Sequence, residues 1–566
     1  MVEVPSTNLE AMLARASSDR GVRFHESAEE NVFLSYRQLD QDARHNAVAL
    51  SQYGVRPGDR VVLAYDPGID FVRAMCACFY AGAVVVPVPL PAARSSDVAS
   101  ERVLQIHRDS GARLILTTPR ITERFEGELP SWQCLSQLED TALAAAWQDP
   151  GTTADDVAIL QYTSGSTGSP KGVTITQRNL VANQEAIQAA IGFDQDSVMV
   201  GWLPHYHDMG LIGLYLQPIY TGFDVVTTSP SQFLRRPAFW LQLISRYRAT
   251  TTVAPDFAYR LCTKVVTDEQ LAALDLSSLR TAVTGAEPVH ASTLQRFQER
   301  FSVAGFDKGA FKPAYGMAES TLLISVKRSG EPCVPLMLDA RELEAGRAAR
   351  ARAEAPSLAV VRCGPPAPHQ EVAVVDPDSG VSLPEGMVGE IWVRGPSVSV
   401  GYWKNEPATR KVFGAQVGNA GGYLRTGDLG FVMDGEVAVT GRLDDVINLR
   451  GRNIYPSDLE TAVSGRVSSH GEAAAAAFAT ADEVITVVVE KPPKGGLLVS
   501  VDEVRAEVAR DFSLSRFNVV VVSRGAIPKT TSGKVRRRAA REKLVSGEFS
   551  VLSPTGDGSV AAKAAR

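Results

Sequence analysis

Between Gly58 and Pro91 the sequence "GDRVVLAYDPGIDFVRAMCACFYAGAVVVPVPLP" predicts a strand, a helix and a second strand in direct succession. Val61–Tyr65 is a short apolar run, Ile69–Tyr80 has the length of a helix, and Val84–Val88 is β-branched and ends at a proline. Apolar strands that alternate with helices form parallel sheets that are covered on both faces. This unit therefore predicts an α/β fold.

The same alternation continues further along the chain. More strands are expected at Val157–Tyr162, Ser197–Leu203, Asp224–Thr228 and Leu279–Thr284, and helices at Gln177–Ile191, Asp208–Tyr220 and Pro237–Tyr247. From about Gly386 the pattern changes to short strands with glycine turns, as in "GEIWVRGPSVSVGYW". This change indicates a small β-rich subdomain attached to the α/β body.

After Arg442 the sequence predicts a compact α+β unit, with a strand at Val484–Val489 and a helix whose start carries a capping box of Ser500 and Glu503. We therefore expect two domains. Residues 1–443 form the large body of parallel sheets flanked by helices plus the β-rich subdomain, and residues 444–566 form a small mobile domain. The stretch "DARELEAGRAARARAEAPS" (Asp339–Ser357) is rich in Ala, Arg and Glu, and composition alone favours a surface excursion or a solvated helix.

Composition excludes several classes of protein. A chain of 566 residues buries a large core without disulfides or a structural metal. Its net charge of −6 argues against nucleic acid as the main partner. The first residues lack the pattern of a signal peptide, and no uncharged apolar run is long enough to span a membrane, so we expect a cytoplasmic protein with no stable membrane insertion. Cys76 and Cys78 lie in an apolar run, which predicts buried thiols rather than metal ligands.

The stretch "LQYTSGSTGSPKGVTI" (Leu160–Ile175) is the first sign of chemistry. Glycines let backbone N–H groups approach an anion, hydroxyls add donors, and Lys171 adds a positive charge, which together are suited to phosphate. The loop differs from the ordinary P-loop because Pro170 precedes the lysine and a strand, not a helix, is expected after it. On its own such a loop is more often only a loop.

Further motifs follow it in the chain. They are "TGAEP" (284–288), "AYGMAES" (314–320), "RTGDLG" (425–430), "GRLDD" (441–445) and "PKTTSGKVRRR" (528–538). Each has an ordinary explanation when taken singly: Asp428 as a residue of a tight turn, Glu319 as an acid at a helix start, and Lys534 as a solvated lysine. In combination and in this order they favour a nucleotide site.

The set resembles the signature motifs of the adenylate-forming superfamily, which contains acyl-CoA synthetases, luciferases and the adenylation domains of peptide synthetases. The resemblance covers nearly the whole chain. More narrowly, the chain is similar to fatty acyl-AMP ligases, on the residues "YAGAVVVPVPLP", "WLPHYHDMGLIGLYLQPIYTGF", "VAPDFAYRL", "YGMAEST" and "IPKTTSGKVRRR". Ala318 stands where the wider superfamily often has threonine. The ligase branch also carries an insertion after this motif, and residues 332–361 are in the corresponding place.

The resemblance implies an ATP site and roles for its residues. The β- and γ-phosphates would be held by Thr163, Ser164, Gly165, Ser166, Thr167, Gly168 and Lys171. Tyr315 would stack on adenine, Asp428 would accept from the ribose hydroxyls, and Arg442 would support that end. The rest of the AMP site would be Gly285, Ala286, Glu287 and Pro288, followed by Gly316, Met317, Ala318 and Ser320.

The implied reaction is attack of a fatty acid carboxylate on the α-phosphorus of ATP, which gives acyl-AMP and pyrophosphate. Lys534 would bridge the two anions, and Glu319 would help to place Mg²⁺. His207 resembles a residue at the carboxylate entrance, although packing or a metal ligand are alternative explanations for it. The acyl chain would lie along the apolar helix that begins at Asp208, near Met209, Gly210, Ile212 and Gly213, where packing and substrate contact cannot be separated from sequence.

In the second half-reaction a thiol attacks acyl-AMP, after the small domain rotates about a pivot that resembles Asp444. In the ligase branch this thiol is the phosphopantetheine of an acyl carrier protein. The chain holds no carrier-like segment, so the resemblance implies a separate carrier protein or a carrier domain of a polyketide or peptide synthase. The alternatives are a fatty acyl-CoA synthetase, an amino-acid-activating domain and a non-catalytic nucleotide-binding regulator. The presence of Lys171, Glu319, Asp428 and Lys534 argues against the last of these.

Overall fold

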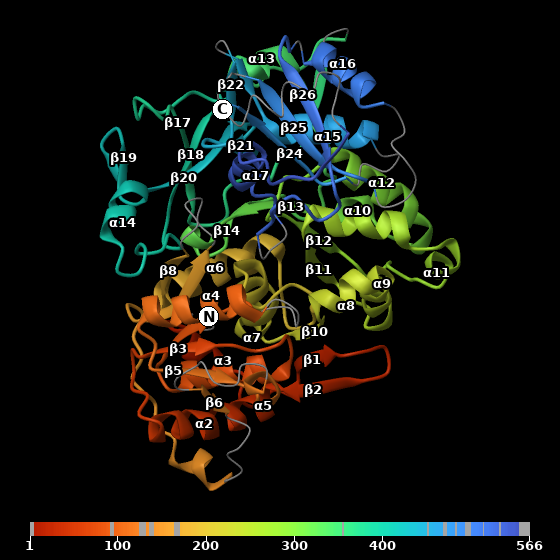
Figure 1. Ribbon diagram of the computed structural model, residues 1–566. Helices are drawn as coiled ribbons and strands as arrows, with labels where there is room; N and C mark the ends of the chain where they lie inside the picture. Colours follow the sequence, from red (N-terminus) through yellow and green to blue (C-terminus); the bar gives the residue numbers. More distant parts are fainter. Residues whose placement is uncertain are drawn as a thin grey trace.

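The computed structural model describes residues 5–90, 96–123, 132–134, 141–163, 170–353, 356–449, 452–467, 473–480, 484–492, 500–512, 514–530 and 534–553. Figure 1 shows two α/β sheets in the lower and middle parts of the molecule, a β-rich sheet at the upper left and a C-terminal unit at the top. Among the described residues, no helix combines the length and the apolar character needed to cross a membrane.

The first sheet has six strands and carries the unit from which the fold class was predicted. In spatial order they are β6 (Trp132–Cys134), β5 (Leu114–Thr117), β3 (Arg60–Leu63), β4 (Val84–Pro87), β7 (Val157–Thr163) and β8 (Lys171–Thr176). All neighbours are parallel except β7 and β8, which pair antiparallel. The predicted strand, helix and strand are β3, α3 (Ile69–Tyr80) and β4. Cys76 and Cys78 on α3 are buried, which confirms the prediction for these thiols.

The second sheet has eight strands and a parallel centre. In spatial order they are β14 (Leu323–Val326), β13 (Phe311–Gly316), β12 (Thr281–Thr284), β11 (Thr251–Ala254), β9 (Val198–Gly201), β10 (Asp224–Thr228), β1 (Gly21–His25) and β2 (Asn31–Ser35). Only the two edge strands, β14 and β2, pair antiparallel. One buried apolar cluster contains side chains from both sheets and from α3 between them, so the α/β body has a shared core.

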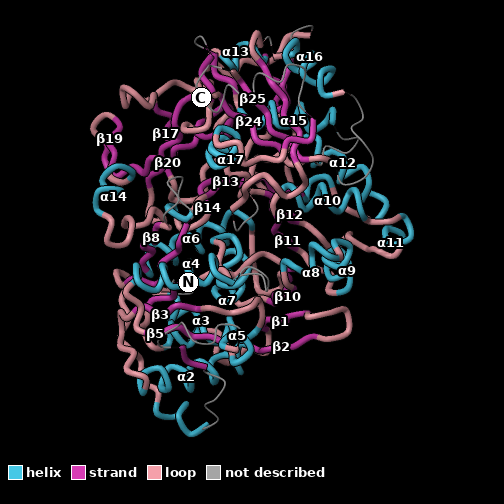
Figure 2. The backbone as a smooth tube through the Cα atoms, in the orientation of Figure 1, coloured by secondary structure: helices cyan, strands magenta, loops and turns pink. Residues whose placement is uncertain are grey.

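Helices surround the two sheets, as Figure 2 shows. In the α/β body they are α1 (Asn8–Leu13), α2 (Tyr36–Gln52), α3, α4 (Ser96–Ser110), α5 (Pro119–Thr122), α6 (Gln177–Ile191), α7 (Gln217–Thr221), α8 (Pro230–Arg235), α9 (Pro237–Arg246), α10 (Asp256–Val265), α11 (Asp268–Ala272) and α12 (Ala291–Phe301). Short 3₁₀ turns lie at η2 (Thr141–Ala146), η4 (Ser302–Ala304), η5 (Lys308–Ala310) and η6 (Ala318–Ser320).

The helix predicted over Asp208–Tyr220 is wrong in its type. Its first part, η3 (Met209–Leu216), is a π-helix, and only Gln217–Thr221 is α-helical. A Cβ on Gly210 would come within 2.0 Å of the Pro204 carbonyl oxygen, so the start of η3 is pressed against the preceding chain. The apolar pattern of this segment surrounds the whole helix and therefore carries no information on the number of residues per turn.

The β-rich subdomain is confirmed as an antiparallel sheet. Its strands are β17 (Glu371–Val375), β18 (Gly389–Arg394), β20 (Ala420–Met433), β19 (Ala415–Val417) and β21 (Glu436–Arg442), with α14 (Glu406–Val412) beside them. The sheet is continuous with the site because β20 and β21 carry Asp428 and Arg442 as directly paired residues.

The Ala/Arg/Glu-rich segment is not the solvated helix that its composition suggested. Among its described residues, which leave out 354 and 355, only α13 (Ala340–Glu344) is helical, and the segment is bracketed by an antiparallel pair, β15 (Leu336–Asp339) and β16 (Ser357–Val360). Its apolar side chains pack onto Phe431 and Ala438 of the β-rich sheet and onto Tyr455 beyond Asp444. Burial of these apolar side chains competes with the helix propensity of the alanines and arginines.

The C-terminal unit has its own sheet and core. Its elements are β22 (Ile447–Leu449), β23 (Arg452–Ile454), α15 (Pro456–Val467), β24 (Ala475–Ala479), β25 (Ile485–Glu490), α16 (Val501–Asp511), β26 (Phe517–Val522), α17 (Arg537–Val545) and β27 (Val551–Ser553). Strands β24 to β27 form one sheet, and α15 and α16 share an apolar cluster with it. The capping box of Ser500 and Glu503 is confirmed at the start of α16. In Figure 1 this unit lies above α10 and α12.

Candidate active site

The phosphate-loop motif lies between two antiparallel strands. β7 ends at Thr163, β8 begins at Lys171, and these two residues face each other in the register of the pair. The predicted strand after Lys171 is thus confirmed, and it distinguishes this loop from a P-loop, which runs into a helix. Ser164, Gly165, Ser166, Thr167 and Gly168 lie outside the described residues.

Glu319 and Lys171 meet at one tyrosine that the sequence did not single out. The Tyr402 hydroxyl donates to Oε1 of Glu319 at 2.7 Å. The Lys171 Nζ lies 5.2 Å from the centre of the same ring, within the range of a cation–π contact. Glu319 sits on the 3₁₀ turn η6 after β13, and its backbone carbonyl accepts from the Ser399 N–H at 2.9 Å. The two charged groups are therefore held around one aromatic ring.

Burial raises the pKa of the Glu319 carboxyl above its ordinary value, and the Tyr402 hydrogen bond and Arg442 offset part of this rise. The ionised form of Glu319 is the form that a cation or a phosphate-bound metal needs. Neutral donors from the Tyr402 hydroxyl and from the Glu319 backbone N–H therefore favour the ionised form against the effect of burial.

The proposed adenine strip lies at the carboxyl ends of β12 and β13, which are parallel neighbours. A Cβ on Gly285 would lie 2.7 Å from the Ala314 carbonyl oxygen, and one on Gly316 would lie 1.9 Å from that of Leu322, so both glycines are required by close backbone approach. Ala286 has φ 64°, a left-handed conformation that costs energy for a residue with a side chain. The backbone of this strip is therefore closely packed and conformationally restricted beside Tyr315.

Tyr315, Asp428 and Arg442 form a connected group. The Tyr315 hydroxyl donates to Oδ2 of Asp428 at 2.7 Å, and Arg442 Nη1 lies 3.0 Å from Oδ1 of the same carboxylate. The prediction of a tight turn at Asp428 is wrong, because this residue lies inside strand β20 at a shift of register. Asp428 is only 8 % exposed, so both of its oxygens are oriented by the protein.

Two residues of the predicted AMP site have partners of their own. The Glu287 carboxylate accepts from the backbone N–H of Phe257 at the start of α10, at 2.7 Å. The Tyr315 ring is buried in an apolar cluster with Ile324, Ile391 and Val437. Glu287 thus links the strip to a helix. Adenine stacking on Tyr315 stays a prediction.

His207, Asp208 and Lys534 lie close together although Lys534 belongs to the C-terminal unit. His207 Nδ1 and Asp208 Oδ1 are 2.6 Å apart, and the Met209 N–H donates to the same oxygen at 2.7 Å. Burial alone would raise the pKa of the Asp208 carboxyl, but His207 and the Lys534 ammonium outweigh it, so the pKa is lowered. Lys534 therefore acts electrostatically across the boundary between the C-terminal unit and the body.

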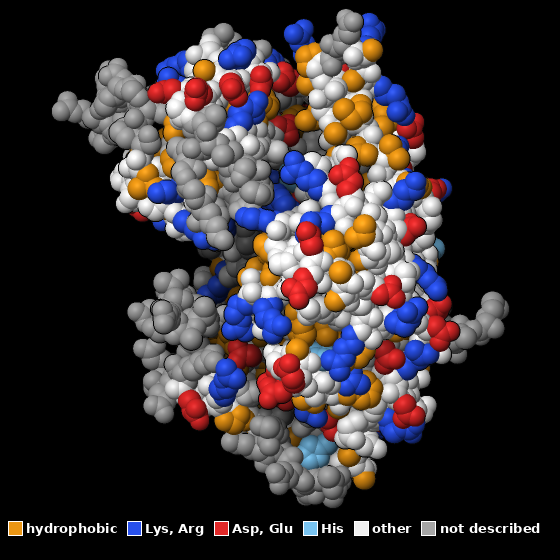
Figure 3. Space-filling view, turned by 90° about the vertical axis from the view of Figure 1, so that its right-hand side faces the viewer, with side chains coloured by type: hydrophobic (Ala, Val, Ile, Leu, Met, Phe, Trp, Pro, Cys, Tyr) orange, Lys and Arg blue, Asp and Glu red, His pale blue; other side chains and the backbone are white. Residues whose placement is uncertain are grey.

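The backbone around Lys534 explains how it is presented. The Thr530 N–H donates to the Lys534 carbonyl at 2.7 Å, and the Lys534 N–H donates to the Thr530 hydroxyl at 3.0 Å. Lys529 and Val535 pair beside them as an antiparallel bridge. These contacts tie Lys534 to Thr530, and the predicted glycine turn at Gly533 lies outside the described residues. Figure 3 shows Lys and Arg side chains around a hollow between the upper and lower parts of the molecule.

The residues expected to contact the acyl chain are mostly packed. Met209 and Ile212 are buried in the main core, and Gly210 contacts the preceding chain. At Gly213 the nearest atom to an added Cβ is 3.4 Å away, on Leu322, and the residue is partly exposed. Gly213 is thus the residue of this set with room beside it, and contact with substrate stays a prediction for all four.

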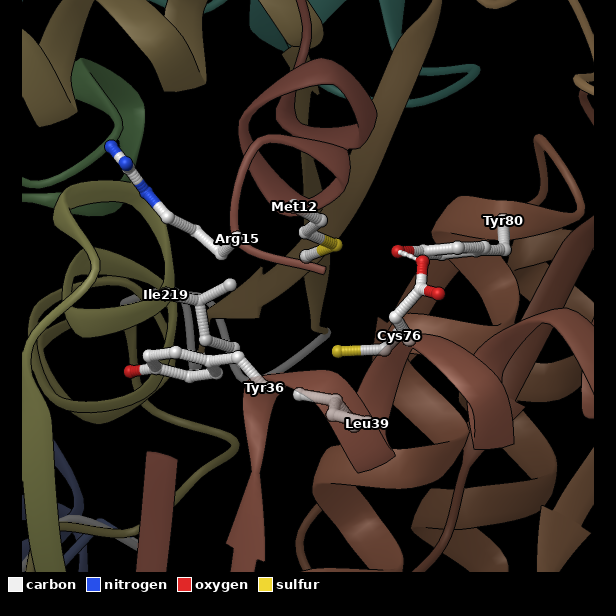
Figure 4. Close-up of a pocket in the computed structure, with 8 residues that line it drawn as sticks. Met12, Arg15, Tyr36, Leu39, Cys76, Tyr80 and Ile219 are labelled. Atoms are coloured by element: carbon white, nitrogen blue, oxygen red, sulfur yellow. Dashed lines mark hydrogen bonds between the residues drawn. The ribbon is translucent and has the colours of Figure 1, made fainter. Parts of the chain in front are cut away.

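A small pocket lies elsewhere, among α1, α2, α3 and α7 (Figure 4). Its volume of about 10 Å³ gives room for about one water molecule, too little for an acyl chain. Figure 4 shows the sulfur atoms of Met12 and Cys76 facing it, with the Tyr80 hydroxyl bonded to Asp40 at 2.7 Å at its edge. This pocket is separate from the residues described above.

Comparisons with known proteins agree with this geometry. Residues 13–403 match the family described as AMP-binding enzyme. The medium-chain-fatty-acid–acyl-carrier-protein ligase JamA of Moorena producens is 40% identical, over 94% of this chain and 93% of that protein. The chain belongs to the AMP-binding enzyme family, in its fatty acyl-AMP ligase branch.

Solved structures of this branch have the same fold. A structure from a study of fatty acyl-adenylate ligases from E. coli and L. pneumophila matches with a TM-score of 0.85 and 33% identity, over 95% of this chain and 97% of that one. The L. pneumophila fatty acyl-adenylate ligase in complex with acyl adenylate and pyrophosphate matches with a TM-score of 0.77 and 34% identity, over 97% of both chains. The adenylate-forming fold is therefore shown for nearly the whole chain.

Enzymes of this family use ATP, and the donor set can be tested for Mg²⁺. The described residues contain no group of three or more His, Cys, Asp or Glu side chains that could hold a metal by themselves. Mg²⁺ is usually bound by one or two carboxylates, several waters and substrate phosphates, not by an all-protein cage. A single half-buried carboxylate at Glu319, which shares the Tyr402 ring with Lys171 of the phosphate loop, fits such a site.

Sequence reasoning missed two residues of this site. Tyr402 was seen only as part of a β-rich pattern, and Asp208 only as a neighbour of His207. No local motif connects Tyr402 with Glu319, because Glu319 lies on η6, Tyr402 lies between β18 and α14, and the insertion separates them in the sequence. A signal for Asp208 was present, since an acid directly after a histidine at a helix start can orient the ring and cap the helix at once.

Proposed function

We propose that this protein is a fatty acyl-AMP ligase that forms an acyl adenylate from a fatty acid and ATP and passes the acyl group to a carrier protein. In the first step a carboxylate oxygen bonds to the α-phosphorus of ATP, and the bond from that phosphorus to pyrophosphate breaks. In the second step the thiol of a phosphopantetheine arm attacks the acyl carbon, AMP leaves, and a thioester forms. Mg²⁺ bound with ATP would neutralise phosphate charge.

The observation that carries this proposal is that three sets of charged side chains come together from separate parts of the chain. Lys171 and Glu319 share Tyr402, Asp428 is oriented by Tyr315 and Arg442, and Lys534 acts on Asp208 across the boundary. An acid oriented by two donors suits two ribose hydroxyls. A lysine brought in from the C-terminal unit suits the point where two anions must meet.

His207 and Asp208 extend this site toward the acyl residues. A donor from His207 would orient the fatty acid carboxylate, while Asp208 fixes the ring through Nδ1. We propose that the acyl chain then follows η3 past Gly213, the partly exposed glycine of this helix. The names of the relatives favour a fatty acid substrate and an acyl carrier protein acceptor.

The choice of acceptor depends on the insertion at residues 332–361. Glu344 of α13 accepts a hydrogen bond from Nε of Arg452 of β23 at 2.8 Å, and Nη2 of the same arginine forms an ion pair with it at 2.7 Å. Arg452 lies just after the proposed pivot Asp444, so rotation of residues 444–566 would break this pair. We propose that the insertion restrains the rotation that the second half-reaction needs and thereby limits the use of free CoA.

An acyl carrier protein loaded in the presence of fatty acid, ATP and Mg²⁺ would be the direct test. Mass spectrometry of the intact carrier reports a thioester as an added acyl mass on its phosphopantetheine. A loaded carrier with little acyl-CoA supports the proposal. Efficient acyl-CoA formation with an unloaded carrier would move the protein to the fatty acyl-CoA synthetases, and absence of any acyl-AMP would favour a non-catalytic nucleotide-binding protein.

A further inference from the structure

The segment around Tyr402 contacts two parts of the nucleotide site, strand β8 and Glu319. Its backbone extends β8 on the outside: the Val400 N–H donates to the Thr174 carbonyl at 3.2 Å, and the Trp403 N–H donates to that of Gly172 at 2.7 Å. Between these bonds Tyr402 pairs with Val173 as an antiparallel bridge. The segment is therefore fixed to the strand that begins at Lys171.

The Tyr402 side chain is fixed from several sides. Its backbone N–H donates to the Thr409 hydroxyl at 2.9 Å, and its ring meets the Phe413 ring edge-on at 5.4 Å. The preceding Gly401 has φ 138°, and a Cβ there would come within 2.5 Å of the Thr409 side chain, so the backbone at this point is closely packed. Little rotamer freedom is left for the ring, which is what a residue that orients others requires.

We propose that Tyr402 is a positioning residue that holds Glu319 and Lys171 in place for the triphosphate and its magnesium ion. The hydroxyl donates to Oε1 of Glu319, and the face of the same ring holds the Lys171 ammonium. The two groups approach from different elements, η6 and β8, and have no shared local sequence. Tyr402 is the connection between them.

An ordinary packing role would explain a half-buried tyrosine without any effect on the nucleotide. Two observations favour the positioning role. The hydroxyl is bonded to a carboxylate expected to help to place magnesium, and the same ring contacts the lysine of the phosphate loop. Partners that orient a metal-binding carboxylate affect metal affinity itself. The inference depends on the proposed function in one respect: the ligand is taken to be ATP with Mg²⁺.

The test compares three variants by calorimetric titration with ATP and Mg²⁺ and, separately, with AMP, which lacks the β- and γ-phosphates. Tyr402→Phe keeps the ring and removes the hydroxyl, and Tyr402→Leu removes both contacts. Tyr80→Phe is the matched control because its hydroxyl also donates to a carboxylate at 2.7 Å, on Asp40, away from the site. Melting temperatures report the cost of each change to the fold.

For Tyr402→Phe we expect roughly ten-fold weaker binding of ATP with Mg²⁺ and AMP binding changed by less than about two-fold. Tyr402→Leu should be weaker still, and Tyr80→Phe should bind both ligands as wild type does. In acyl-AMP formation, Tyr402→Phe should raise the apparent KM for Mg²⁺ more than it lowers kcat at saturating Mg²⁺.

Binding of ATP with Mg²⁺ at wild-type affinity by Tyr402→Phe would overturn the proposal. An equal loss for AMP and for ATP with Mg²⁺ would also overturn it, because it would indicate general damage to the nucleotide site. The titrations need no fatty acid, so a wild-type protein that binds ATP but forms no acyl-AMP would contradict the proposed function alone.

Discussion

The ion pair between the insertion and the C-terminal unit gives a direct way to change the choice of acceptor. Glu344→Gln keeps the size of the side chain and removes the charge that pairs with Arg452. Both side chains are partly buried, at 19% and 34% exposure, and the pair has two contacts at 2.7 and 2.8 Å. Arg452 keeps its bond to the Phe512 carbonyl at 2.9 Å, so the variant should fold.

The expected size of the effect follows from this geometry. Exposed ion pairs contribute up to 1 kcal/mol, and hydrogen bonds to charged groups contribute more, so this pair should stabilise the observed arrangement by about 1 to 2 kcal/mol. Its loss shifts the equilibrium toward a rotated unit by about 5- to 30-fold. Acyl-CoA formation from free CoA should rise within that range, whereas acyl-AMP formation should be unchanged because Glu344 does not contact the nucleotide site.

The assay separates acyl-AMP, acyl-CoA and loaded carrier by mass spectrometry at a fixed fatty acid concentration. Glu342→Gln is the matched control, because Glu342 pairs with Arg347 within the insertion at 2.7 Å and does not bind Arg452. If Glu344→Gln and Glu342→Gln give the same ratio of acyl-CoA to acyl-AMP as wild type, the pair does not restrain the C-terminal unit and the reasoning fails.

Three further changes test other parts of the site. Lys534→Ala should lower acyl-AMP formation by at least about 100-fold but spare transfer from supplied acyl-AMP, and adenylation at the wild-type rate would refute its role. Tyr315→Phe should raise the KM for ATP by roughly ten-fold, since it removes a donor to Asp428, and an unchanged KM would exclude that contribution. Burial raises the pKa of Asp458 to about 7, so its contribution to stability is complete at acidic pH and is lost as the pH rises toward 7. Because pH 5 already lies above the ordinary pKa of an aspartate, Asp458→Asn should melt higher than wild type by a wider margin at pH 8 than at pH 5; the same difference at both pH values would contradict the burial penalty.

Local patterns were enough for much of the fold. The bounds of α3, α6 and β10 agree with the predicted Ile69–Tyr80, Gln177–Ile191 and Asp224–Thr228. α3 and β10 are buried over nearly their whole length, whereas α6 begins after a capping box at Thr176 and ends at Gly192 in the left-handed conformation, so local sequence marks the limits of all three. The same reasoning failed for η3, whose apolar residues surround the helix, and for α13, where composition favoured a helix but hairpin pairing and core packing limit it to five residues.

Only the residues of the site that belong to local sequence motifs could be predicted. Lys171, Glu319, Asp428 and Lys534 stand in recognisable local contexts, whereas the bonds that orient them come from distant segments. The Tyr315 hydroxyl on Asp428 and the Tyr402 hydroxyl on Glu319 connect segments that are far apart in the sequence. Such pairs depend on how these segments pack against each other, and no single stretch of sequence carries that information.

The most direct test of the account is to identify the products when fatty acid, ATP and Mg²⁺ are supplied with CoA and a phosphopantetheine-bearing acyl carrier protein together. The account predicts that acyl-AMP forms and that the acyl group appears on the carrier, with little acyl-CoA. Acyl-CoA as the main product with an unloaded carrier, or no acyl-AMP at all, would contradict it.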